Sequence, residues 1–248
     1  MGSSSYIFLD RHFDTDQSHI QKILDYFARV GYNYQILLYP EGTDKCPLAT
    51  ERSRLYAKKH GLVHYEYVLH PRTTGFVYII QNMRKDKYID YVYDVTVGFG
   101  DCIVQSEVDF ACQGVCPKEV YYQVRKLKIE DLPTDHDELA QWLVNLWKEK
   151  EEKLRQFYSL PRETRHFENT PNGVDHEMTA RVSMVQFIIM AFWLFTTMIW
   201  VYGFFMIPYM RMWTIASCSC FVFMQFRWGG VEWLTIHLFN RSRKDASL

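Results

Sequence analysis

The sequence has no excess of charge of either sign. Its 248 residues include 28 Lys and Arg and 29 Asp and Glu, which gives a formal net charge of -1. A protein that binds nucleic acid through many phosphate contacts needs a basic surplus, so this balance argues against a nucleic-acid partner. The chain is also 48% hydrophobic, which excludes a disordered chain because that much apolar surface can form a core.

Several common catalytic motifs are missing as well. The sequence contains no Gly-x-Ser-x-Gly, no phosphate-binding loop with Gly-Lys-Ser/Thr and no His-Glu-x-x-His. Gly98-Phe99-Gly100 lacks the third glycine of a dinucleotide-binding fingerprint. His64-x-Glu66 is not followed by the Pro-Cys-x-x-Cys of a zinc deaminase. These absences argue against the corresponding hydrolase, nucleotide-binding and metalloenzyme classes.

Cysteine is scarce and poorly spaced for metal binding. The chain has six cysteines, and Cys112 and Cys116 are one residue too far apart for a Cys-x-x-Cys pair. Cys218 and Cys220 lie in an apolar C-terminal segment. We therefore expect free thiols, without a disulfide framework and without a metal site.

Charge is absent from one long stretch, Val182 to Met210. At about 1.5 Å per residue, a helix of this length exceeds the roughly 30 Å hydrocarbon core of a bilayer. The stretch predicts a transmembrane helix, and Pro208 is expected to end it. The alternative is a buried core helix, but the run contains aromatic residues of the kind that lie at membrane interfaces: Trp193, Trp200, Tyr202 and Tyr209.

A second uncharged run lies between Arg211 and Arg227. It is short for a span unless the arginines extend toward the interface, so it predicts either a second transmembrane helix or a re-entrant return. The tail carries Arg241, Arg243 and Lys244, which by the positive-inside rule places it in the cytosol. Two spans would then place residues 1–180 in the cytosol too. The start of the chain, MGSSSY, has no feature of a signal peptide.

Residues 6–128 alternate between short apolar runs and helical periodicity. Ser18 and Gln21 form a capping-box pattern, and Gly31 is expected to end that helix. Thr50 is expected to begin a second helix that ends at Gly61. The predicted strands are 6–10, 34–39, 65–69, 88–99 and one around Val120–Val124, and a third helix is predicted over 72–87. Alternating strands and helices favour an α/β fold with a mostly parallel sheet.

A long helix is expected to begin near Thr134 and Asp137. Its apolar residues recur at helical spacing, which indicates packing against a core or a membrane surface. The charged run Lys148–Arg155 is interpreted as a solvated face with paired charges. Residues 100–117 are predicted to form a polar loop, and Pro161–Asp175 a linker.

The sharpest local signal is Tyr39-Pro40-Glu41-Gly42-Thr43, which follows one predicted strand, while Arg11 follows another. Ligands collect at the carboxyl ends of strands in α/β sheets, so Arg11 and this turn are expected to face one crevice. A guanidinium, the amides around Gly42 and the Thr43 hydroxyl would together bind a phosphate. The alternative is an ordinary turn, since Pro, Glu and Gly are common turn residues.

These blocks resemble a known family. YPEGT after an apolar strand is similar to the Phe-Pro-Glu-Gly-Thr block of the glycerolipid acyltransferase superfamily, and YIFLDR is similar to its second block. The resemblance continues through HGLVHYEYVLHPRTTGF (60–76), IDYVYDVTVGF (89–99), the Trp-rich helix and two hydrophobic C-terminal segments. It is strongest to the branch of lysocardiolipin and lysophosphatidylinositol acyltransferases.

The resemblance implies transfer of an acyl group from acyl-CoA to a lysophospholipid hydroxyl, at the cytosolic face of the endoplasmic reticulum membrane. No cofactor is implied besides acyl-CoA, which is the donor substrate. The residues implied to bind substrate are Arg11, Glu41, Gly42 and Thr43, with His70, Pro71 and Arg72 from the fourth block. Many members carry Arg after Gly-Thr where this chain has Asp44, which shifts phosphate recognition toward Arg11.

The catalytic block of the family, His-x-x-x-x-Asp, is absent. None of the nine histidines is followed by Asp five positions later. Loss of a general base typically costs about 10²- to 10⁴-fold in rate. We interpret the chain as missing an N-terminal portion, assign no catalytic residue and expect it to be inactive by itself. His12 and His70 could be imagined as substitutes, but structural roles fit both better.

The resemblance divides the chain into three parts. Residues 1–132 are expected to form a partial acyltransferase α/β domain, 133–180 a long amphipathic helix and linker, and 181–248 a membrane region. Two further hypotheses stay open beside the enzyme. One is a non-catalytic membrane protein that binds lipid or acyl-CoA, or regulates a full-length relative. The other, a cytosolic metal protein, is disfavoured by the apolar run.

Overall fold

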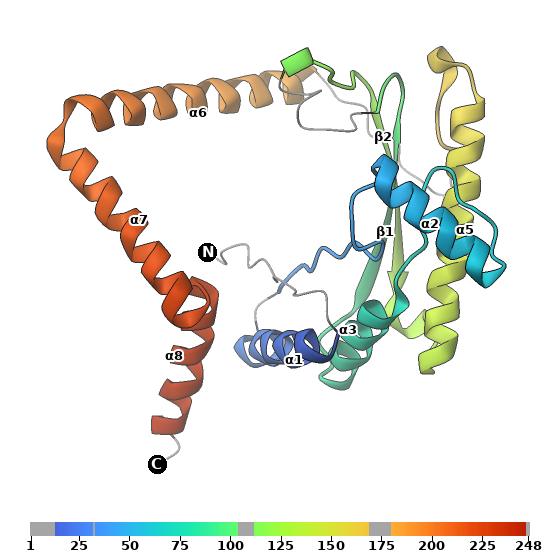
Figure 1. Ribbon diagram of the computed structural model, residues 1–248, viewed down its shortest axis with the longest axis horizontal. Helices are drawn as coiled ribbons and strands as arrows, with labels where there is room; N and C mark the ends of the chain where they lie inside the picture. The colour runs from blue at the N-terminus through green and yellow to red at the C-terminus, as the bar shows by residue number, and fades with distance from the viewer. Residues whose placement is uncertain (1–12, 32, 104–111, 169–179, 247–248) are drawn as a thin grey trace. The chain divides into compact units, whose positions relative to one another are not determined.

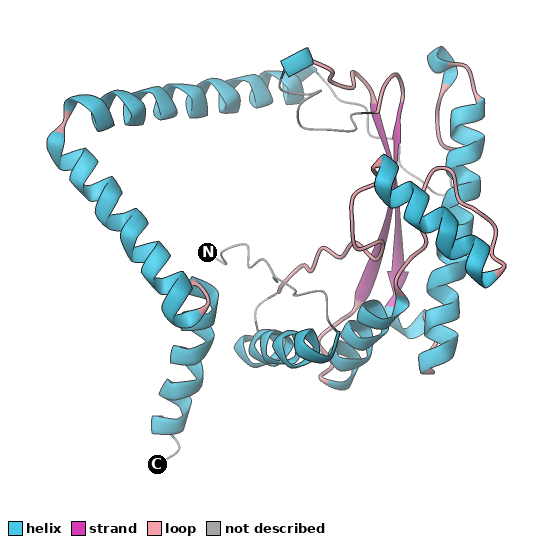
Figure 2. Ribbon diagram, in the orientation of Figure 1, coloured by secondary structure: helices cyan, strands magenta, loops and turns pink. Residues whose placement is uncertain are grey.

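The computed structural model describes residues 13–31, 33–103, 112–168 and 180–246 (Figures 1 and 2). The chain divides into two compact units, which we describe separately. One consists of residues 7–169, and the other of residues 1–6 with 170–248.

The first unit contains most of the helices and both described strands. In chain order these are α1 (Phe13–Val30), α2 (Pro47–His60), α3 (Thr73–Lys85), β1 (Tyr91–Phe99), β2 (Val120–Lys128), the 3₁₀ turn η1 (Ile129–Asp131), α5 (His136–Ser159) and the 3₁₀ turn η2 (Arg162–Thr164). The helix predictions for 18–31, 50–61 and 72–87 are confirmed within a few residues at most ends. Gly31 and Gly61 end their helices in the left-handed conformation, with φ of 71° and 65°.

Helix starts differ more from expectation than helix ends. α1 begins at Phe13, five residues before the predicted cap at Ser18. α2 begins at Pro47, because proline is well suited to a first helical turn, and Thr50 instead donates its hydroxyl to the Cys46 carbonyl at 3.0 Å. α5 is capped by Asp135, whose carboxylate accepts hydrogen bonds from two amides of the first turn.

β1 and β2 pair antiparallel, from Tyr91 opposite Lys128 to Phe99 opposite Val120. The prediction of a mostly parallel sheet is therefore wrong for the described residues, whose sheet has two strands. The α/β class is confirmed only in the coarse sense that helices accompany a small sheet. Alternate residues of both strands are exposed on one face, whereas the other face carries the buried Asp94, Thr96 and Gly98.

Two of the predicted strands are loops (Figure 2). Residues 34–39 have no regular structure, and the Leu37 side chain is 77% exposed. A short apolar run forms a strand only where a neighbouring strand accepts its hydrogen bonds, and no described strand pairs with this one. Residues 65–69 bend instead of extending, because three of their amides bond to a side chain of α5. The strand predicted at 6–10 lies outside the described residues.

α5 lies beside the sheet and packs on α3 and β1 (Figure 1). The main core of this unit is formed by buried side chains from α3, α5 and the segments next to them: Tyr65, Val68, Phe76, Val77, Ile80, Leu132, Leu139, Leu143, Leu146, Trp147 and Leu154. A smaller cluster joins Ile20 and Leu24 of α1 to Ile79 and Met83 of α3. The predicted apolar stripe of the long helix is thus confirmed as core packing.

The interpretation of Lys148–Arg155 as a solvated face is wrong at two positions. Lys150 and Glu151 are only 6% and 4% exposed. The Lys150 ammonium donates to the Val95 carbonyl at 2.7 Å and forms an ion pair with Asp94, which also pairs with Arg125. These partners satisfy charges that would otherwise be costly to bury.

The second unit is helical in its described residues, with α6 (Ala180–Met206), α7 (Pro208–Trp228) and α8 (Val231–Ala246). By length and composition, one described helix could cross a membrane, over Ser183–Met206. Within this span, none of the most apolar window is buried, which argues against the core-helix alternative. The break before Pro208 is confirmed, but proline begins α7 as well as ending α6. α7 forms, yet a second span is not confirmed.

Candidate functional site

The predicted turn at residues 39–43 is closed by its own backbone. The Gly42 amide donates to the Tyr39 carbonyl at 2.9 Å. Gly42 has a φ of +74°, a conformation that side chains with a Cβ disfavour. The glycine in Pro-Glu-Gly-Thr is therefore required by the backbone geometry of the turn itself.

The turn lies directly against the segment 69–72, about thirty positions later in the sequence. The Arg72 amide donates to the Pro40 carbonyl at 2.7 Å. The Glu41 carboxylate accepts a hydrogen bond from the Leu69 amide. A Cβ added at Gly42 would lie 3.4 Å from the Arg72 Cδ. The structure thus brings Glu41, Gly42 and Thr43 together with the backbone of Leu69 to Arg72.

Arg72 is the exposed cation of this arrangement. It precedes the first residue of α3, and its side chain passes beside Gly42. Among the described residues it forms no ion pair, in contrast to Arg125 or Arg155. An exposed guanidinium next to the exposed residues of this turn is free to bind phosphate oxygens in a bidentate manner.

Glu41 points into the protein. Its Oε1 accepts a hydrogen bond from the Trp147 Nε1 of α5 at 2.9 Å. Burial raises the pKa of Glu41 above its ordinary value, although the bonds from Trp147 and Leu69 and the charge of Lys150 oppose that increase. Its carboxylate holds neighbouring segments together, so we assign it no direct contact with an anion.

Thr43 is available only in part. Its hydroxyl donates to the neighbouring Asp44 carboxylate at 3.0 Å, in an exposed position. That bond would have to break before the hydroxyl could donate to a ligand. Asp44 therefore competes with an incoming anion for Thr43 as well as repelling it.

His70 packs away from solvent. Its ring stacks on Tyr65 with centroids 4.3 Å apart, and its amide donates to the Ser53 hydroxyl of α2 at 3.2 Å. Its Nε2 is buried without a hydrogen-bond partner. Burial lowers the pKa of His70, which keeps the imidazole neutral at pH 7. These contacts describe a packed histidine, and Pro71 connects it to Arg72.

Arg11 lies outside the described residues. The prediction that Arg11 and the turn share a crevice stays a prediction. Among the described residues, Arg72 occupies the position beside the turn that the sequence argument gave to Arg11.

Two residues of the site went unrecognised in the sequence. In the sequence, Trp147 falls in the apolar stripe predicted for the long helix, and Glu151 falls in the charged run Lys148–Arg155. Trp147, Glu151 and Leu154 are spaced i, i+4 and i+7, so Glu151 falls on the buried face of the helix. In the sequence, the position of the Glu151 carboxylate on this apolar face indicates that it makes a buried polar contact.

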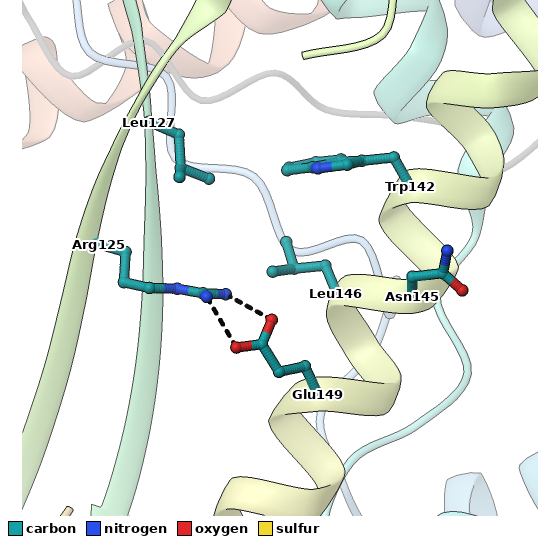
Figure 3. Close-up of a pocket in the computed structure, with 6 residues that line it drawn as sticks. All are labelled: Arg125, Leu127, Trp142, Asn145, Leu146 and Glu149. Carbon is teal, nitrogen blue, oxygen red and sulfur yellow. Dashed lines mark hydrogen bonds and ion pairs between the residues drawn. The ribbon is translucent and has the colours of Figure 1, made fainter. Parts of the chain in front are cut away.

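A separate pocket lies between β2 and α5 (Figure 3). It has a volume of about 180 Å³, and its lining residues are Arg125, Leu127, Trp142, Asn145, Leu146 and Glu149. Arg125 and Glu149 face each other across it in an ion pair of 2.8 Å (Figure 3). Pockets that bind drug-sized ligands have volumes of about 300–1,000 Å³, and this arginine is already paired, so the pocket is a poor candidate for an anionic ligand.

Metal and redox centres are not evident in the described residues. No group of three or more His, Cys, Asp or Glu side chains in that part of the chain could hold a metal ion. All six cysteines are free thiols.

Comparison with known proteins gives matches along the whole chain. Residues 112–193 match the family model described as acyltransferase C-terminus. The chain is 34% identical over 249 aligned residues to lysophosphatidylinositol acyltransferase 10 of Caenorhabditis elegans, covering 99% of this chain and 64% of that protein. It is 33% identical to lysocardiolipin acyltransferase 1 of Mus musculus, covering 100% of this chain and 65% of the relative.

A shorter match is closer in sequence. Lysocardiolipin acyltransferase 1 of Gallus gallus is 40% identical over 158 residues, which cover 64% of this chain and 42% of that protein. The chain spans a little under two thirds of the length of the worm and mouse relatives. No solved structure matches it significantly.

Proposed function

From the match to the acyltransferase C-terminus model and to lysophosphatidylinositol and lysocardiolipin acyltransferases, we propose that the chain belongs to this branch of the glycerolipid acyltransferases and serves acyl transfer to lysophospholipids. The donor is acyl-CoA, and the acceptor is a lysophospholipid with an anionic headgroup. The product is a remodelled phospholipid. The relatives named above carry these acceptors in their names, which supports the substrate class.

The observation that carries the proposal is the junction of the Pro-Glu-Gly-Thr turn with Arg72. We assign the headgroup phosphate to the Arg72 guanidinium, beside the exposed residues Gly42 and Thr43 of the turn. Gly42 allows close approach of an anion because it has no side chain. Charge-assisted hydrogen bonds from a guanidinium are stronger than neutral ones, so Arg72 supplies most of the attraction. Glu41 supports the turn from behind.

The proposed chemistry is ester formation. The acceptor hydroxyl oxygen bonds to the thioester carbonyl carbon, the carbon–sulfur bond breaks, and coenzyme A leaves as a thiolate that takes up a proton. A general base must first accept the hydroxyl proton. None of the nine histidines stands in a His-x-x-x-x-Asp block, and the described contacts of His70 do not suit it as the base.

The same anion site also suits a second candidate function. In this form the chain would bind anionic lipid at the same site, or acyl-CoA apart from it, without turnover, and would act as a regulator beside a full-length relative. Both candidates use the same anion site, and they differ only in whether product forms.

A location in the endoplasmic reticulum membrane, with the first unit and the tail on the cytosolic side, fits both candidates. The apolar helix over Ser183–Met206 supports membrane attachment. The basic residues near the C-terminus support a cytosolic tail.

The test uses the full chain reconstituted in phosphatidylcholine vesicles. Labelled acyl-CoA is added with lysophosphatidylinositol, lysocardiolipin or lysophosphatidylcholine, and both binding and labelled product are measured. Arg72→Ala is expected to weaken binding of the anionic lysolipids about tenfold or more, because a charged hydrogen bond is lost. Arg29→Ala, on the exposed side of α1, is the matched control.

The outcomes separate the two candidates. Turnover by the wild-type chain that falls in Arg72→Ala supports the enzyme, and binding without turnover supports the regulatory form. Equal binding of neutral and anionic lysolipids, or equal effects of the two arginine variants, would contradict the assigned site.

A further inference from the structure

One helix contacts both segments that form the proposed anion site. Trp147 and Glu151 stand four residues apart on α5 and therefore share one face of the helix. Trp147 bonds to Glu41 in the turn, and Glu151 bonds to the segment that leads into Leu69–Arg72. The two contacts join residues separated by 106 and 84 positions in the sequence.

Glu151 binds a row of three consecutive amides. Its Oε1 accepts from the Glu66 amide at 2.9 Å, and its Oε2 accepts from the Tyr67 and Val68 amides at 2.8 and 3.2 Å. The carboxylate also pairs with Arg155 at 3.0 Å. Successive amides that converge on one anion form a backbone nest, and this one fixes the path of residues 66–68.

Trp147 binds the other segment, the Pro-Glu-Gly-Thr turn. It is 9% exposed, and its indole nitrogen, which can only donate, is used by Glu41. Glu41 in turn accepts from the Leu69 amide. A chain of bonds thus runs from α5 through the turn to the segment 69–72.

α5 itself is fixed to the sheet. Lys150, between the two contact residues, donates to the Val95 carbonyl and to the Thr96 hydroxyl at 2.7 and 3.2 Å. Its ion pair with Asp94 is buried on both sides. The helix is therefore a rigid support rather than a mobile cover.

We propose that Trp147 and Glu151 are positioning residues that set the separation between the Pro-Glu-Gly-Thr turn and Arg72, and so determine the affinity of the site for an anionic headgroup. Neither residue touches the lipid. The inference rests on the proposed function for its ligand, but the positioning itself is a property of this chain alone.

The test compares Trp147→Phe and Glu151→Gln with matched controls on the same helix. Phenylalanine keeps the aromatic packing but removes the indole N–H. Glutamine keeps the shape of Glu151 but has one oxygen fewer, and its amide group would face backbone amides. Trp142→Phe is the control for Trp147→Phe, because Trp142 stacks on Phe76 with ring centroids 6.0 Å apart and lines the separate pocket. Glu152→Gln is the control for Glu151→Gln, since the Glu152 side chain is 61% exposed.

The probe is lysophosphatidylinositol added to the full chain in detergent, with acyl-CoA as a second probe. Trp147→Phe and Glu151→Gln are expected to raise the Kd for lysophosphatidylinositol about five- to tenfold, leaving that for acyl-CoA within twofold. If turnover is present, KM for the lysolipid rises more than kcat falls. Equal effects on both probes, or effects no larger than those of the controls, overturn the proposal.

A readout without ligand separates this inference from the proposed function. Amide hydrogen exchange at residues 66–70 is expected to become at least tenfold faster in Glu151→Gln and to stay unchanged in Glu152→Gln. Unchanged exchange in Glu151→Gln would show that the Glu151 carboxylate does not hold the segment. If exchange changes while the wild-type chain binds no lysolipid, the proposed function fails and the positioning stands.

Discussion

Helices α5 and α6 have similar lengths, 24 and 27 residues, but they treat charge in opposite ways. α5 is rich in charge and buries two of its ionic side chains, Lys150 and Glu151, each with several partners. Between Val182 and its last residue, Met206, α6 has no charge at all. Where hydrogen bonds from hydroxyl groups of α6 are described, the acceptor is a carbonyl of the same helix; the Thr196 hydroxyl, for example, donates to the Phe192 carbonyl.

The difference reflects the kind of surroundings in which each helix is stable. α5 packs against protein groups that can accept and donate hydrogen bonds, so it can carry buried charge at specific positions. An all-apolar helix without such partners is suited to a lipid surrounding, where unpaired polar groups are costly. The buried charges of α5 therefore fix its position within the first unit, whereas the apolar surface of α6 suits it to a lipid environment.

The largest test of this comparison removes a buried partner of α5. Asp94→Asn leaves Lys150 and Arg125 facing a neutral side chain, so we expect it to destabilise the first unit by about 3–5 kcal/mol. Urea unfolding followed by the fluorescence of the α5 tryptophans measures the change. Asp131→Asn, on the exposed turn η1, is the control, and similar stability of the two variants would contradict a buried ionic support.

The converse test introduces a charge into α6. Leu194→Arg lies near the middle of Ser183–Met206 and should disfavour membrane insertion by about 2.5–3.5 kcal/mol. Insertion into microsomes, followed by alkaline extraction, measures the fraction that remains in the bilayer. Leu194→Ala should stay inserted. If alkaline extraction removes no more Leu194→Arg than wild-type protein, this helix does not lie in the hydrocarbon core of the bilayer.

A smaller effect is expected at the turn that α5 supports. Gly42→Ala forces a Cβ into a left-handed residue and against Arg72, which should cost about 1–2 kcal/mol and weaken binding of anionic lysolipid. Gly31→Ala has the same backbone problem, with φ of +71°, but nothing within 4 Å of the added atom. It should therefore lower stability without affecting the lysolipid Kd. Equal Kd changes would remove the link between the turn and the lipid.

The smallest effect concerns pH. Burial raises the pKa of Glu41, so the folded protein binds its proton more tightly than the unfolded chain does. The stabilisation from this residue is therefore complete below its ordinary pKa of 4.5 and is lost as pH rises through the folded value. The difference in unfolding free energy between wild type and Glu41→Gln should decrease over that range. A difference that increases with pH would contradict the buried position of Glu41.

Local patterns predicted the helices well and the sheet poorly. The apolar residues of α1 and α5 recur at helical spacing, and Gly31 and Gly61 mark real ends. The run 34–39 is as apolar as a strand, but a strand also needs a partner, which no local pattern contains. Strand direction was likewise assigned from alternation alone, whereas β1 and β2 pair antiparallel.

The site shows the same limit. Its turn and its Leu69–Arg72 segment were each visible as motifs, and the hydrogen bond from the Arg72 amide to the Pro40 carbonyl brings the two together. The side chains that join them were not visible, because the roles of Trp147 and Glu151 depend on residues about 80 to 106 positions away. Only the spacing of Glu151 on the buried face of its helix gave a local indication.

The bond between Trp147 and Glu41 also has a consequence for biosynthesis. A ribosome makes the turn first, and the residue of α5 that bonds to it is added 106 residues later. Contacts between such distant segments form slowly, since a long loop must close first. The proposed anion site therefore stays incomplete while these 106 residues are made, and it can be completed only once α5 has emerged.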